Sequence, residues 1–89
     1  WEAGVTKEYI VLCGQVVGNG ERLEVLYGFD GERFRDRKKA IRHGLKTRGS
    51  DDFNVGVLED GKLVSLDWMD KPVDTEPSVL EPIAEQIYL

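Results

Sequence analysis

An Asp60-Gly61 pair between two apolar runs places the tightest constraint on how this chain can fold. The pair favours a two-residue β-hairpin turn, because Asp and Gly both tolerate the positive φ that such a turn requires. Apolar residues alternate from Phe53 to Val57 before the pair and recur from Leu63 to Trp68 after it. The pattern therefore predicts a β-hairpin over residues 53–68.

A second hairpin is predicted over residues 8–29. Tyr9 to Cys13 is a continuous apolar run, which is typical of a strand buried on both faces. Gly18-Asn19-Gly20 follows as a turn signal, since Gly and Asn accept positive φ. From Leu23 to Phe29 every second residue is a large apolar one, the period of a strand with one face inward.

Two helices complete the predicted elements. Residues 35–48 should form the first, because Phe34, Ile41 and Leu45 recur at helical spacing. Gly44 would weaken this helix by about 1 kcal/mol relative to Ala, so its presence favours a close approach to the sheet. Ser78 can cap a shorter C-terminal helix, whose apolar stripe is Val79, Leu80, Ile83, Ala84, Ile87 and Tyr88.

The order of these elements is ββαββα, which predicts an α+β fold. Two β-hairpins would form a four-stranded antiparallel sheet, with two helices packed on one face. We expect residues 1–89 to be a single small domain, as is usual at this length. Residues 1–7 are expected to be flexible, and residues 70–78 to form a loop before the C-terminal helix.

Composition narrows the class of protein. A hydrophobic content of 40% is too high for a disordered chain. A single Cys permits no intrachain disulfide, which fits a reducing, cytoplasmic setting. The longest apolar run, Tyr9 to Cys13, is far shorter than the roughly 20 residues of a membrane-spanning helix. We therefore expect a soluble protein with no membrane partner.

Charge is distributed very unevenly along the chain. Eight of its twelve Lys and Arg residues lie between Arg33 and Arg48, where Asp36 is the only acid, so this block carries +7. Residues 51–89 carry two Lys and ten acids, which gives −8, and the whole chain carries −5. Such asymmetry is informative about partners rather than about fold.

Four cations of the basic block are predicted to share one exposed face of the first helix, opposite its apolar stripe. These candidate binding residues are Arg35, Lys39, Arg42 and Lys46. They could neutralise phosphates of a nucleic acid, but no aromatic residue interleaves with them to stack on bases. They could also be a solvated face whose charges pair with the acidic remainder of the fold.

No residue pattern indicates catalysis or a cofactor. His43 is the only His and has no companion that would make it a general base, and Cys13 is expected to be a small buried hydrophobe. A metal-dependent hydrolase built on Asp51, Asp52, Asp67 and Asp70 ranks last, because the spacing matches no calcium loop. We expect no catalytic residues, no metal and no cofactor.

The leading hypothesis is a non-enzymatic protein–protein interaction or regulatory module with a charge-polarised surface. The alternative is a nucleic-acid-binding domain that uses the basic face formed by Arg35, Lys39, Arg42 and Lys46. A monomer or a weak homodimer is expected in either case, since an open edge strand is one route to self-association.

Overall fold

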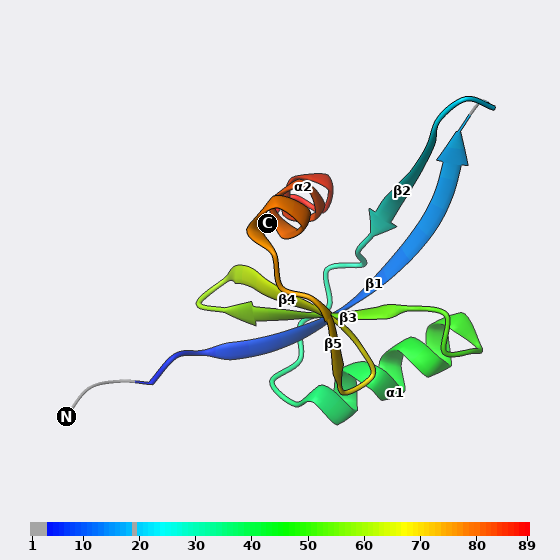
Figure 1. The fold of residues 1–89 in the computed structure, drawn as a ribbon. Coiled ribbons are helices and arrows are strands. Elements are labelled where there is room, and N and C mark those ends of the chain that lie inside the picture. The colour runs from blue at the N-terminus through cyan, green and yellow to red at the C-terminus, as the bar shows by residue number, and fades with distance from the viewer. Residues whose placement is uncertain (1–3, 19) are drawn as a thin grey trace.

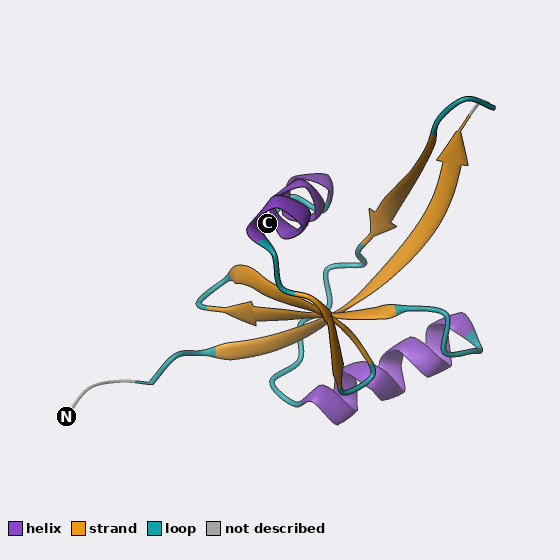
Figure 2. Ribbon diagram, viewed as in Figure 1, coloured by secondary structure: helices purple, strands orange, loops and turns teal. Residues whose placement is uncertain are grey.

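A five-stranded antiparallel sheet forms the centre of the computed structural model, which describes residues 4–18 and 20–89 (Figure 1). Its strand order is β2-β1-β3-β4-β5. The strands are β1 (Lys7–Gly18), β2 (Leu23–Gly28), β3 (Asn54–Glu59), β4 (Lys62–Trp68) and β5 (Lys71–Asp74), and the helices are α1 (Arg37–Arg48) and α2 (Pro77–Gln86) (Figure 2). The predicted α+β class, the antiparallel sheet and both hairpins are confirmed.

The β3–β4 turn has the predicted chemistry. Asp60 and Gly61 both have positive φ, at 52° and 84°. The same turn is hydrogen-bonded to the residue that precedes β1. Thr6 donates its N–H to the Asp60 carboxylate, and its carbonyl accepts the Asp60 N–H. Lys7 then begins β1. The predicted Gly18-Asn19-Gly20 turn depends on Asn19, which lies outside the described residues.

The two helices lie on opposite faces of the sheet, so the prediction that both pack on one face is wrong (Figure 1). Ile10 and Leu12 of β1 point into a cluster with Leu80 and Ile83 of α2. Val11, between them, points the other way, into a cluster with Ala40 of α1. Successive strand residues face opposite sides, so a strand that is apolar on both faces needs cover on both.

The predicted loop 70–78 contains a fifth strand, so the observed order is ββαβββα. β5 pairs with β4 after a tight turn in which Met69 has a φ of 57°. Pro72 argued against a strand, but an edge strand tolerates proline because its outer N–H needs no partner. Helix α2 starts at Pro77 rather than after Ser78, and its N-cap residue Glu76 makes no side-chain capping bond.

Helix α1 starts later than predicted, and of its predicted apolar stripe Ile41 packs on the core beneath the sheet but Leu45 does not. Asp36 caps the helix by accepting the Lys38 N–H, so Phe34 lies outside the helix. Its buried residues are Ala40 and Gly44, whereas Leu45 of the predicted stripe is 44% exposed. The close approach at Gly44 is confirmed, because a Cβ there would lie 2.5 Å from the Phe53 ring.

β1 is shared between two ladders. Lys7–Leu12 pairs with β3, and Cys13–Gly18 pairs with β2 on the opposite edge. The second half of β1 and β2 therefore leave the body of the sheet as a two-stranded projection (Figure 1). We call residues 13–18 and 23–28 the arm.

Candidate functional site

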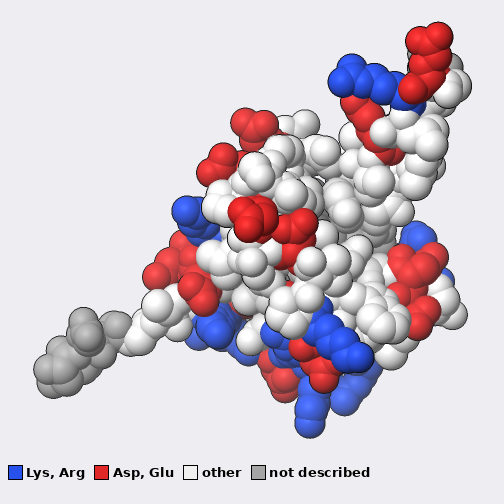
Figure 3. Space-filling model, viewed as in Figure 1, with Lys and Arg blue, Asp and Glu red and all other residues white. Residues whose placement is uncertain are grey.

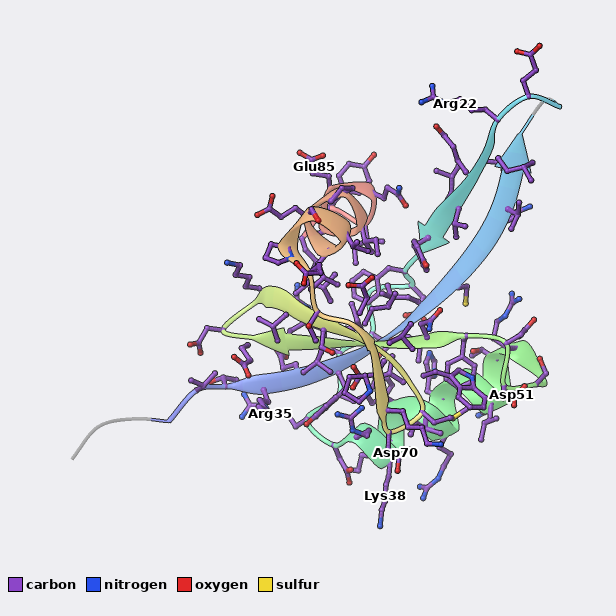
Figure 4. All side chains as sticks on the ribbon, in the orientation of Figure 1. Arg22, Arg35, Lys38, Asp51, Asp70 and Glu85 are labelled. Carbon is purple, nitrogen blue, oxygen red and sulfur yellow. The ribbon has the colours of Figure 1, made fainter. Side chains whose placement is uncertain are left out.

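Three of the four predicted basic residues are brought together on α1. Lys39, Arg42 and Lys46 line a shallow hollow of about 270 Å³ together with Phe34 and His43. Arg35, which precedes the N-cap of the helix, is exposed and does not line this hollow (Figure 4). We call the five lining residues the α1 hollow.

The cations of the α1 hollow form one row along the helix. Lys39, Arg42 and Lys46 are three and four residues apart, the spacing that places side chains on one side of a helix. At a rise of 1.5 Å per residue, the row extends about 10 Å along the axis. All three side chains belong to exposed residues.

Three other cations near α1 are paired, whereas Arg35 and Lys38 have no carboxylate within 4.0 Å among the described residues. Arg33 lies 3.6 Å from Glu8, Arg37 lies 2.6 Å from Asp67, and Arg48 lies 3.1 Å from Asp52. The hydrogen bond from Arg48 holds the pKa of the Asp52 carboxyl below its usual value.

No such pairing reaches the row of cations. Among the side chains of residues 4–18 and 20–89, no carboxylate lies within 4.0 Å of Lys39, Arg42 or Lys46. Lys and Arg gather over α1 in the lower part of Figure 3, and Asp and Glu are frequent above it, over α2. The row is therefore a local positive surface on a negatively charged protein.

An aromatic ring lies among these cations, contrary to the prediction from sequence. Phe34 reaches the α1 hollow because its backbone exchanges hydrogen bonds with Tyr9 of β1, at 2.6 and 2.9 Å. Its ring lies 5.1 Å from the His43 ring, centroid to centroid. Phe34 also packs against the core cluster, as its spacing predicted, but no local signal would have placed its ring in the α1 hollow.

His43 is held in place by Asp30. Its Nε2 lies 2.7 Å from Asp30 Oδ2, and 23% of its side chain is exposed. Partial burial would raise the pKa of the Asp30 carboxyl, but the bonds from His43 and from the Glu32 N–H outweigh it and lower that pKa. The imidazole is therefore a fixed part of the α1 hollow, beside the ring of Phe34.

Arg37 has a structural role. Its guanidinium contacts the Asp67 carboxylate and the Met69 carbonyl, at 2.6 and 3.1 Å, and lies 4.9 Å from the centre of the Tyr9 ring. The second Asp67 oxygen accepts the Ser65 hydroxyl. Asp67 is only 2% exposed. This pair joins the first turn of α1 to β4 and fixes the row of cations relative to the sheet.

The acidic residues considered for a metal site do not converge. Asp67 is engaged by Arg37 and Asp52 by Arg48, while Asp51 and Asp70 lie apart (Figure 4). In the part of the chain that the structure describes, no three His, Cys, Asp or Glu side chains are grouped so that they could hold a metal ion.

Two further observations concern the length of the helices and the similarity of this chain to known proteins. No helix in the described ranges is long and apolar enough to cross a membrane. Comparison with protein-family models, with curated proteins and with solved structures found no match for this chain.

Proposed function

We propose that this domain is a non-enzymatic interaction module that binds an acidic segment of a partner protein on the basic face of α1. The observation that carries the proposal is the row formed by Lys39, Arg42 and Lys46, which line one hollow and have no carboxylate within 4.0 Å among residues 4–18 and 20–89. A positive surface left unpaired on a protein of net charge −5 is a site where an anionic ligand replaces the missing counter-charge.

The dimensions of the row favour a short ligand. Acidic residues on three successive turns of one helix match it, because each turn rises about 5.4 Å and the three residues span about 10 Å. The acidic surface above α1 would repel a long polyanion, whereas a short segment stays within about one Debye length of the cations. Exposed pairs contribute about 0.2–1 kcal/mol each, so binding is expected to be weak and salt-dependent.

A second candidate function is binding of single-stranded nucleic acid, and Phe34 is the observation that favours it. Its ring lies in the α1 hollow beside Arg42 and Lys46. Aromatic rings next to cations bind single strands by stacking on a base while the cations neutralise phosphates. Arg35, at the start of the same segment, would extend the positive track (Figure 4).

The proposal is tested by titrating isotope-labelled protein and following its amide shifts. One ligand is a short peptide with glutamates on successive helical turns, and the other is a short single-stranded oligonucleotide. We expect the peptide to shift the amides of the α1 hollow at near-physiological salt, and the oligonucleotide to bind more weakly. Stronger binding of the oligonucleotide, with shifts centred on Phe34, would favour the second function.

Two variants of equal charge separate a site from a general charge effect. Arg42→Glu reverses a cation of the α1 hollow, and Arg22→Glu makes the same change at an exposed residue in the turn at the tip of the arm, far from α1 (Figure 4). We expect Arg42→Glu to weaken peptide binding at least tenfold, about 1.4 kcal/mol, and Arg22→Glu to change it little. Equal losses in the two variants would show that only net charge matters, and the proposal would fail.

A further inference from the structure

The two edges of the sheet are built differently. β5 is four residues long and carries Lys71 and Pro72, two features that protect an edge from pairing with another chain. β2, at the other edge, is six residues long, and Glu24 is its only charged residue. It has neither lysine nor proline, so nothing in its sequence opposes the addition of a strand.

The outer edge of β2 presents backbone groups that can pair. The Tyr27 N–H donates to Gln86 Oε1 of α2 at 2.9 Å, so it points away from β1. Strand residues alternate in the direction of their backbone groups, and the N–H and C=O groups of Val25 and Leu23 therefore also point outward. β2 is the outermost strand of the sheet, so no other strand of residues 4–18 and 20–89 lies on that side.

One face of the arm is apolar along its length. The register places Gly14 opposite Tyr27, Val16 opposite Val25, and Gly18 opposite Leu23. Only Tyr27, at the base, packs on the cluster beneath α2. Val16, Val25 and Leu23 are 63%, 45% and 73% exposed. A two-stranded ribbon is marginally stable by itself in water, so this projection is expected to gain from a further strand.

We propose that β2 pairs antiparallel with β2 of a second copy of this chain, about a two-fold axis at Val25. Val25 then faces Val25 of the second copy, Leu23 faces Tyr27, and Glu24 faces Leu26. The strand is self-complementary in this register, because no like charges are opposed and apolar residues meet on the exposed face. The two sheets join into one, with the same surface used by both copies.

Neighbouring registers are less favourable. An axis at Glu24 would oppose two glutamates. An axis at Leu26 would pair Val25 with Tyr27, whose N–H is already engaged by Gln86. With the axis at Val25, the two Val25 residues exchange N–H and C=O bonds, and Leu23 donates to the Tyr27 carbonyl, while Gln86 keeps its bond. In this register the second copy's β2 starts at Leu23, opposite Tyr27. Its chain therefore turns back before it reaches α2, which flanks the edge beside Tyr27.

The oligomeric state over a range of concentrations is the first test, measured by sedimentation or light scattering. We expect the wild-type protein to dimerise, and a monomer at every concentration would overturn the proposal. Val25→Lys and Val25→Glu each place like charges on the axis, so each variant should be monomeric. An equimolar mixture of the two should recover the dimer as a heterodimer, which excludes misfolding as the cause of the loss.

The matched control is Val73→Lys, which makes the same change at an exposed valine of the opposite edge strand. It should leave the dimer intact, and equal weakening by Val73→Lys would contradict an interface at β2. A second measurement tests the register. In a Cys13→Ser background, Val25→Cys should form an intermolecular disulfide on mild oxidation, because directly opposed strand residues lie within disulfide range. If the wild-type protein dimerises but the Val25→Cys variant forms no intermolecular disulfide, the proposal is also overturned.

Discussion

Arg37 joins the first turn of α1 to β4 by placing its guanidinium 2.6 Å from the buried carboxylate of Asp67. The pair connects the two parts of the molecule that form the candidate site, the helix that bears the cations and the sheet that supports it. A buried carboxylate is tolerated only when its charge is compensated and its oxygens are hydrogen-bonded, and Arg37 and Ser65 meet both conditions here.

Loss of Arg37 should therefore be costly. We expect Arg37→Met to lower the free energy of unfolding by about 3 kcal/mol, because it leaves Asp67 buried without a partner. Chemical denaturation measures this directly. Arg35→Met is the matched control, since Arg35 is exposed, and it should change stability by no more than about 0.5 kcal/mol. If the two variants are equally stable, the pair is not structural.

Gly44 should not accept alanine, although alanine is the better helix former. The gain in helix propensity is about 1 kcal/mol, but the new Cβ would lie 2.5 Å from the Phe53 ring. Overpacking of this kind typically costs about 1–3 kcal/mol, so a net loss of stability is expected in thermal unfolding. Thr47→Ala, on the exposed side of α1, serves as the control and should be neutral or stabilising. A more stable Gly44→Ala protein would show that α1 can move away from the sheet.

Stability should depend on the ionisation of Asp30. Its pKa is lowered from 3.8 in the folded protein, so its contribution is complete well above pH 3.8 and is lost as the pH falls through the folded value. Asp30→Asn should be less stable than wild type near neutral pH, and the difference should vanish in acid. Because the Asp30 side chain is about half exposed, we expect only a few tenths of a kcal/mol. Denaturation at several pH values tests this, with the exposed Glu85→Gln as control (Figure 4).

Phe34 discriminates between the two candidate functions. Stacking of a base on an aromatic ring contributes about 1–3 kcal/mol, so Phe34→Leu should weaken oligonucleotide binding about tenfold or more. Binding of an acidic peptide, which rests on the cations, should change little. Fluorescence anisotropy with labelled ligands measures both affinities. Equal losses for the two ligands would indicate that Phe34 acts by shaping the α1 hollow.

Features that depend on neighbouring residues alone could be predicted from the sequence. The Asp60-Gly61 turn and the β3–β4 hairpin were predicted because turn type depends on adjacent residues alone. Lys39, Arg42 and Lys46 were predicted to share a face because helix geometry fixes that from spacing. The side of the sheet that each helix covers was missed, although β3 is buried from Val55 to Leu58 and so needs cover on both faces.

Features that depend on distant contacts could not be predicted. Phe34 enters the candidate site through a bridge to Tyr9, a contact between segments far apart in the chain. β5 was concealed by Pro72, which is acceptable only because the strand lies at an edge. Leu45 was wrongly assigned to the inward face of α1, because the small residues Ala40 and Gly44 are the ones that let the helix approach Phe53.

The division of β1 between two ladders has a consequence for local unfolding. Lys7–Leu12 lies against β3 with a helix on each face of the sheet, whereas the residues beyond Cys13 have β2 alone. Opening of the arm would therefore leave the remaining sheet closed. Amide hydrogen exchange along this one strand should change from slow to fast near Cys13, and protection beyond that point should increase with protein concentration if β2 pairs with a second copy.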